Sequence, residues 1–165
     1  MKRAQACLLV VWVLGAVWAV SAQEENAPVQ PIPFSHKVHA GNLKLQCKSC
    51  HPNPDPGESM TIAKTSTCMQ CHSAVKKESP AIQKLAQADK DGKPMEWKRV
   101  YGIPAFVSFS HRTHLEKGNT CQECHGAVAE RDKLYREVNL SMGTCMDCHA
   151  GKKASVDCTF CHEPR

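Results

Sequence analysis

Five copies of the pattern Cys-x-x-Cys-His account for ten of the eleven cysteines in this chain. Two thiols at this spacing can each form a thioether with one vinyl group of a porphyrin, while the adjacent histidine binds the iron. Zinc sites need two Cys-x-x-Cys pairs per metal, and neither zinc nor a disulfide framework explains a histidine after every pair. The pattern therefore predicts five covalently bound c-type haems. The first to fifth haem motifs are Cys47/Cys50/His51, Cys68/Cys71/His72, Cys121/Cys124/His125, Cys145/Cys148/His149 and Cys158/Cys161/His162.

The remaining four histidines form two His-x-x-His pairs, His36/His39 and His111/His114. Residues three apart on a helical turn project from nearly the same face, so each pair can reach the irons of two adjacent haems. We therefore expect all four to be distal iron ligands. Four haems then have two histidine ligands, which favours low potential and low-spin iron closed to small molecules.

One haem is left without a second histidine, and the count places it in the later part of the chain. A methionine thioether would raise the potential of that haem above the others. Met142, just before the fourth haem motif, is the first candidate, followed by Met60 and Met95. Packing of Met142 against a porphyrin is an alternative role for this side chain. A lysine or a partner's side chain could bind at the sixth position instead, or the iron could stay open.

The chain contains a duplicated unit. Segments 34–51 and 109–125 share Phe-Ser-His-x-x-His, a Gly-Asn pair and a haem motif, and each is followed by Thr-Cys-Met-x-Cys-His. We expect a first haem unit over 34–72 with two haems and a second over 109–165 with three. The linker 73–108 is predicted to hold a helix over 79–91, because Ser79 is a suitable N-cap, Pro80 suits the first helical position and Gly92 ends the pattern.

The first 22 residues are typical of a secretory signal peptide cleaved near Ala22. Lys2 and Arg3 precede an apolar run over 6–20, which is shorter than the roughly 20 residues of a membrane-spanning helix. We expect a periplasmic protein with a Pro-rich arm over 23–33. Fewer than thirty residues then remain for each haem, which predicts a mostly irregular fold with short α-helices around a core of stacked haems.

The formal charge of +5 is no argument for nucleic-acid binding, because haem propionates add negative charge. The lysine pairs Lys76/Lys77 and Lys152/Lys153 are candidates for docking an acidic redox partner, with solvated surface as the alternative.

The order Phe-Ser-His-x-x-His followed by Cys-x-x-Cys-His resembles the class III multihaem cytochromes c. The resemblance implies that His36 and His111 serve the haem attached just after each of them, and that His39 and His114 reach a different haem. The stretch over 97–128 is also similar to the pentahaem subunit of alternative complex III. A fully bis-histidine pentahaem carrier would need ten histidines, whereas this chain has nine.

We therefore predict electron transfer between periplasmic or membrane redox proteins, with no enzymatic reaction, small-molecule substrate or nucleic acid. Two alternatives stay open. One is a small haem reductase that uses an open iron, and the second is a non-diffusing haem subunit of a membrane-bound respiratory complex.

Overall fold

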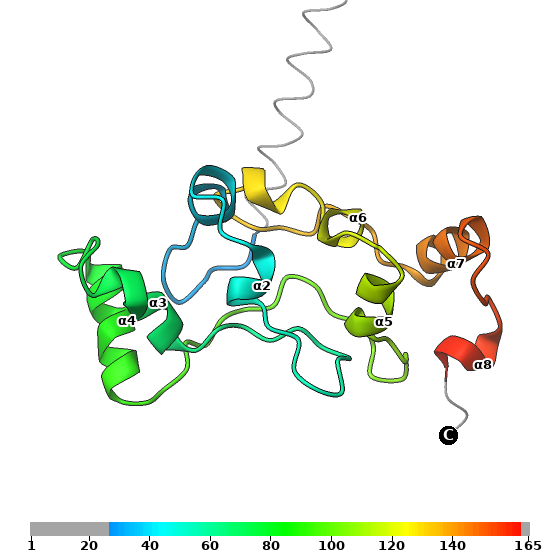
Figure 1. The fold of residues 1–165 in the computed structure, drawn as a ribbon, viewed down its shortest axis with the longest axis horizontal. Helices are drawn as coiled ribbons and strands as arrows, with labels where there is room; N and C mark the ends of the chain where they lie inside the picture. Colours follow the sequence, from blue (N-terminus) through cyan, green and yellow to red (C-terminus); the bar gives the residue numbers. More distant parts are fainter. Residues whose placement is uncertain (1–26, 163–165) are drawn as a thin grey trace, which may run out of the picture.

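The computed structural model describes residues 27–162, and in this range it contains short helices joined by irregular segments and no strand (Figure 1). The predicted mostly irregular fold is thus confirmed. The signal peptide predicted over 1–22 lies outside the described residues. None of the helices within 27–162 is long and apolar enough to cross a bilayer. The elements are η1 (Lys37–Asn42), α2 (Cys47–Cys50), α3 (Thr65–His72), α4 (Pro80–Lys90), α5 (His111–Glu116), α6 (Cys121–His125), η2 (Val128–Glu130), α7 (Met142–Gly151) and α8 (Cys158–Cys161).

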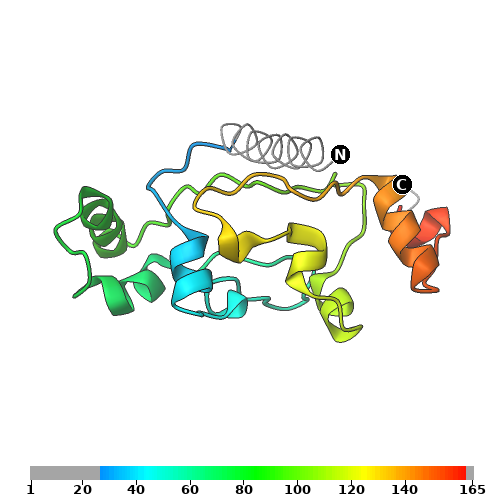
Figure 2. The ribbon, with the colours of Figure 1, turned by 90° about the horizontal axis from the view of Figure 1, so that it is seen from above.

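The molecule is elongated. Figure 1 and Figure 2 show α3 and α4 at one end of the long axis and α7 and α8 at the other. Among the described residues only three apolar side chains are buried, those of Ile32, Leu85 and Tyr135. Large exposed apolar side chains instead flank the haem motifs, including Leu45 before the first and Phe160 within the fifth. The protein by itself therefore has little core, and these side chains are available to pack against porphyrin.

Helix α4 lies where the linker helix was predicted. Ser79 is its N-cap, Pro80 occupies the first turn and Gly92 follows the C-terminus with φ +64°. Leu85 is only 3% exposed in this helix, which packs against α3. Helix α4 thus supports the helix that carries the second haem motif.

The two haem units pack reciprocally, because each His-x-x-His segment bonds to backbone from the other unit. In the first unit, the amide of Lys37 donates to the carbonyl of Arg131 at 2.9 Å, and η1 packs against η2. In the second unit, the amide of Arg112 donates to the carbonyl of Gly57 at 3.0 Å. Arg112 also forms an ion pair with Asp55, with Nη2 and Oδ1 2.5 Å apart. The duplicated units are therefore interlocked along the chain rather than stacked as independent bodies.

Candidate haem-binding sites

Each haem motif lies on a short helical segment. The two cysteines of a motif are three residues apart, so one helical turn places both thiols on the same face. None of the motif cysteines forms a disulfide. The free thiols are those of Cys47, Cys50, Cys68, Cys71, Cys121, Cys124, Cys145, Cys148, Cys158 and Cys161.

The surroundings of these thiols leave them open to a porphyrin. In the second motif, for example, Cys71 is exposed near the C-terminal end of α3, and Cys68 one turn earlier is half-buried. In the described part of the chain, no three His, Cys, Asp or Glu side chains converge on one point as they do in a zinc site.

Four of the five attachment histidines face a second histidine at nearly the same separation. Two imidazoles on opposite sides of one metal ion, each bonded at about 2 Å, have ring centres about 6 Å apart. The observed ring-centre distances fit this requirement. They are 6.3 Å for His36/His51, 6.1 Å for His39/His72, 6.4 Å for His111/His125 and 6.0 Å for His114/His149.

The angle between the two imidazole planes divides these four sites into two classes. The planes are almost parallel at the first and third motifs, with angles of 6° and 5°. They are tilted by 52° and 46° at the second and fourth motifs. The duplication therefore extends from the sequence to the orientation of the ligands.

Backbone carbonyls fix which imidazole nitrogen faces the partner ring. A carbonyl only accepts a hydrogen bond, so an Nδ1 beside it must carry the proton, which leaves Nε2 free to bind iron. Six of the eight paired histidines have this contact, at 2.7–3.1 Å. The pairs are His39 with Ser35, His51 with Thr61, His72 with Val75, His111 with Glu58, His114 with Ser110 and His149 with Ser155.

Burial favours the neutral imidazole at the centre of the molecule. Burial, followed by the nearby His51 and His39, lowers the pKa of His36 to about 4. Burial, followed by His111 and His51, also lowers the pKa of His125. Because only a deprotonated nitrogen can bind iron, these environments favour the form of histidine that is a ligand.

In each His-x-x-His pair, one phenylalanine ring contacts both histidine rings. The Phe34 ring lies 4.8 Å from His36, edge to face, and 4.5 Å from His39. Phe109 repeats both distances with His111 and His114. The sequence reasoning assigned no role to these phenylalanines, although their place in the repeated Phe-Ser-His-x-x-His motif was a usable signal.

A hydrogen-bonded network supports the third haem motif. The Tyr101 ring meets His125 edge to face at 4.9 Å, and its hydroxyl accepts from the amide of Glu137 at 2.9 Å. The Glu137 carboxylate accepts from the amide of Ala127 at 2.9 Å and from the guanidinium of Arg131. Burial raises the pKa of Glu137, but these hydrogen bonds and the charge of Arg131 outweigh it and lower the pKa overall.

Pairs of thiols show which motifs are neighbours. Burial and then Cys50 of the first motif raise the pKa of Cys68 in the second. Burial and then Cys47 of the first motif raise the pKa of Cys121 in the third, so these two thiols lie near each other. Burial and then Cys148 of the fourth motif raise the pKa of Cys124 in the third, and burial and then Cys161 of the fifth motif raise the pKa of Cys145 in the fourth. The motifs therefore follow one another in the order second, first, third, fourth, fifth, which Figure 1 shows as α3, α2, α6, α7, α8 along the long axis.

The fifth motif has a different neighbour. The ring of Phe106 lies 5.8 Å from that of His162, with an angle of 30° between the planes. The backbone amide of Ser108 donates to the carbonyl of Cys161 at 2.8 Å, which holds this segment against α8. Met142 is the first residue of α7 and its side chain is 66% exposed. It lies one turn before Cys145 on the same face of α7, and Cys145 is the thiol whose pKa Cys161 of the fifth motif helps to raise.

The comparisons with known proteins agree with this arrangement. Residues 107–163 match the family described as cytochrome c7 and related cytochrome c, and residues 38–126 match cytochrome c3. The chain is 31% identical over 182 aligned residues to a protein of Nitratidesulfovibrio vulgaris strain Hildenborough named menaquinone reductase, multiheme cytochrome c subunit. The alignment covers 94% of this chain and 87% of that protein. The chain therefore belongs to the cytochrome c3/c7 family of multihaem c-type cytochromes, and it is an electron-transfer protein.

Proposed function

We propose that this chain holds five covalent haems as one continuous electron pathway, in the order second, first, third, fourth, fifth. The observation that carries the proposal is the set of four histidine pairs with ring centres 6.0–6.4 Å apart, each pair containing one attachment histidine. The first four haems would each have two histidine ligands. The electrostatic interactions between thiols of successive motifs, which raise their pKa values, support close spacing of the haems.

When bound, each haem would supply one-electron redox chemistry between the ferric and ferrous states of its iron. The chain's own residues would hold the imidazole ligands of the irons in place. The carbonyls at Nδ1 fix the imidazoles, and the ring contacts of Phe34 and Phe109 limit their rotation. Fixed ligands reduce the rearrangement that accompanies each electron transfer, and exclusion of water by apolar side chains tunes the potential.

We further propose that the chain is the haem subunit of an exported, membrane-associated respiratory complex rather than a freely diffusing carrier or a small haem reductase. Support comes from the similar protein, which is named as a subunit of menaquinone reductase and aligns along nearly the whole chain. By analogy, the haems would exchange electrons with a quinone-reducing partner. Native purification of the mature protein tests this. Recovery with membrane proteins is the expected result, and recovery as a free monomer from the soluble fraction contradicts it.

We propose that Met142 is the sixth ligand of the iron in the fifth haem. Its place one turn before Cys145, the thiol of α7 that interacts electrostatically with Cys161 of the fifth motif, supports it, while the Phe106 ring beside His162 is the competing neighbour. A near-infrared magnetic circular dichroism spectrum of the oxidised holoprotein separates the two. We expect a methionine-to-iron charge-transfer band that disappears in Met142→Ala. A high-spin ferric signal already present in the wild type would show that the thioether does not bind.

The number and ligands of the haems are tested on the same holoprotein. Intact mass and the pyridine haemochrome assay are expected to give five haems per chain. Low-temperature EPR is expected to give four low-spin haems with two histidine ligands each. A ratio below four haems per chain, or high-spin iron at two or more sites, would refute the proposed pathway.

A further inference from the structure

We propose that Lys152 is a positioning residue for the fourth haem and acts through a group of three side chains that we call the polar clamp. The polar clamp consists of Lys152 after the fourth motif, Asn119 before the third motif and Glu123 inside the third motif. This inference rests on the proposed haem ligation, because it gives these residues a role in placing the ligands of one iron.

The Lys152 ammonium bridges two segments that are distant in the sequence. Its Nζ donates to Oε1 of Glu123 at 2.8 Å and to Oδ1 of Asn119. Lys152 is the C-cap of α7, whereas Glu123 belongs to α6 and forms a capping box with Thr120. The Lys152 and Glu123 side chains are 48% and 45% exposed. An isolated ion pair with such exposure stabilises a protein little, so the effect of Lys152 depends on its second acceptor.

Asn119 extends the bridge to the proposed distal ligand of the fourth haem. Its Oδ1 accepts from Lys152, and its Nδ2 donates to the carbonyl of His114 at 2.9 Å. The same carbonyl accepts from the backbone amide of Asn119 at 3.1 Å. The rings of His114 and His149 lie 6.0 Å apart, and Lys152 follows His149 on the same helix. The polar clamp therefore connects the two segments that carry the two proposed ligands of one iron.

The first unit has the same backbone arrangement without the polar clamp. The amide of Leu45 donates to the carbonyl of His39 at 3.1 Å, which is the counterpart of the bond to His114. The three clamp positions, matched by their distance from the haem motifs, hold uncharged residues in the first unit, so no ion pair can form there. The matched pairs are Asn119 and Leu45, Glu123 and Ser49, and Lys152 and Val75.

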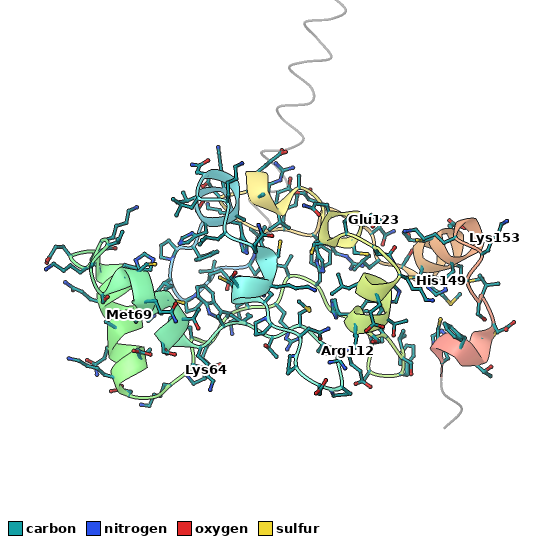
Figure 3. The ribbon with its side chains drawn as sticks, viewed as in Figure 1. Lys64, Met69, Arg112, Glu123, His149 and Lys153 are labelled. Atoms are coloured by element: carbon teal, nitrogen blue, oxygen red, sulfur yellow. The ribbon has the colours of Figure 1, made fainter. Side chains whose placement is uncertain are left out.

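The two units support the helices of their second haem motifs in different ways. In the first unit α3 packs against α4, where Leu85 is buried and the hydroxyl of Thr65 donates to Asp89 at 2.9 Å. In the part of the chain that the structure describes, no helix packs against α7 to a similar extent. Figure 3 shows Glu123 on the side of α7 nearer the centre of the molecule and Lys153 toward the end. The polar clamp therefore has the role at the fourth motif that α4 has at the second.

The test compares five-haem holoproteins by low-temperature EPR of the oxidised state. Lys152→Met keeps an unbranched side chain but removes its charge and its hydrogen-bond donors. Lys153→Met is the matched control, because it removes the same charge from the next residue, which is exposed and outside the polar clamp. Lys152→Arg keeps a charged donor and is the conservative variant. Asn119→Leu introduces the residue that the first unit has at this position.

We expect Lys152→Met to shift or broaden the low-spin signal of one haem with tilted ligand planes and to leave the parallel class unchanged. Asn119→Leu is expected to give the same change, and the double variant no more than either, because both act on one connection. Lys152→Arg is expected to restore the wild-type signal. In an EPR-monitored redox titration, Lys152→Met is expected to lower the potential of the same haem, because a nearby cation favours the ferrous state.

Four results would overturn the inference. An unchanged spectrum and potential in Lys152→Met show that the polar clamp does not position the haem. An equal change in Lys153→Met assigns the effect to net charge. A change that persists in Lys152→Arg shows that the charged donor is not what matters. Additive changes in the double variant show that Lys152 does not act through Asn119. The proposed ligation fails separately if the wild type itself shows fewer than four low-spin haems with two histidine ligands.

Discussion

Gly126→Ala is expected to destabilise the haem site at the centre of the pathway. Gly126 follows the third haem motif with φ +73° and ψ −160°, a region open essentially to glycine only. A Cβ at this position would overlap the carboxylate of Glu137 and lie 2.9 Å from its Cβ. The backbone conformation costs roughly 1–3 kcal/mol for any other residue. Displacement of Glu137 from Ala127 and Arg131 adds roughly 1–3 kcal/mol. We therefore expect a loss of about 2–6 kcal/mol.

The measurement is guanidinium unfolding of the oxidised holoprotein, followed at the haem Soret band. Gly151→Ala is the matched control, because Gly151 ends α7 and no atom lies within 4 Å of its added Cβ. We expect the control to be neutral or to gain up to about 1 kcal/mol from the helix preference of alanine. EPR of Gly126→Ala is expected to show loss of one low-spin signal of the parallel class. A free energy of unfolding within about 0.5 kcal/mol of the wild type would refute the steric argument.

Three further predictions follow from the geometry. Low-temperature EPR is expected to resolve two classes of low-spin ferric haem, because the angle between the two imidazole planes controls the magnetic anisotropy of the iron. These angles are 5–6° at two sites and 46–52° at the other two. A spectrum with one class only would contradict this division. Glu137→Gln is expected to cost about 1–3 kcal/mol at neutral pH, since the carboxylate and Arg131 are 17% and 19% exposed. The pKa of Glu137 is lowered in the folded state, so the stabilisation by its carboxylate is complete above about pH 4.5 and is lost as pH falls through the folded-state pKa. If the unfolding curves of the wild type and Glu137→Gln stay equally far apart down to about pH 3, this prediction is wrong. Leu85→Ala is expected to cost about 2–5 kcal/mol, measured by the same unfolding assay, and a cost below about 1 kcal/mol would show that α4 does not support the second haem motif.

The sequence predicted the features that depend on local chemistry. The haem motifs, the two His-x-x-His pairs and the linker helix each follow from residues a few positions apart, such as Ser79 and Pro80 at the start of α4. The spacing of His36 and His39 also predicted that the two would reach different haems. The structure separates them in this way, with His51 opposite one and His72 opposite the other.

Long-range contacts account for what the sequence did not predict. The reciprocal packing uses backbone groups, as in the bond from the amide of His111 to the carbonyl of Glu58, and a backbone bond has no side-chain signature. The same limit applies to the carbonyls that orient the imidazoles, because any residue supplies one. Tyr101 and Glu137 meet across 36 residues, and neither lies in a repeated motif. Phe106 occupies the irregular segment before the second unit, where no periodicity marks a contact with His162.

The reciprocal packing explains how a duplicated unit becomes one pathway with two unlike ends. Each unit places its His-x-x-His segment against the other unit, so the first and third motifs lie together at the centre, where Cys47 helps to raise the pKa of Cys121. The second motif, on α3, and the fourth, on α7, then lie toward opposite ends of the long axis (Figure 1). The first unit ends at the second motif, whereas the second unit continues into the fifth motif, where the described residues place Phe106 and no second histidine beside the ring of His162. Duplication by itself would give a symmetric carrier, and the added fifth motif makes the two ends of the proposed pathway unlike.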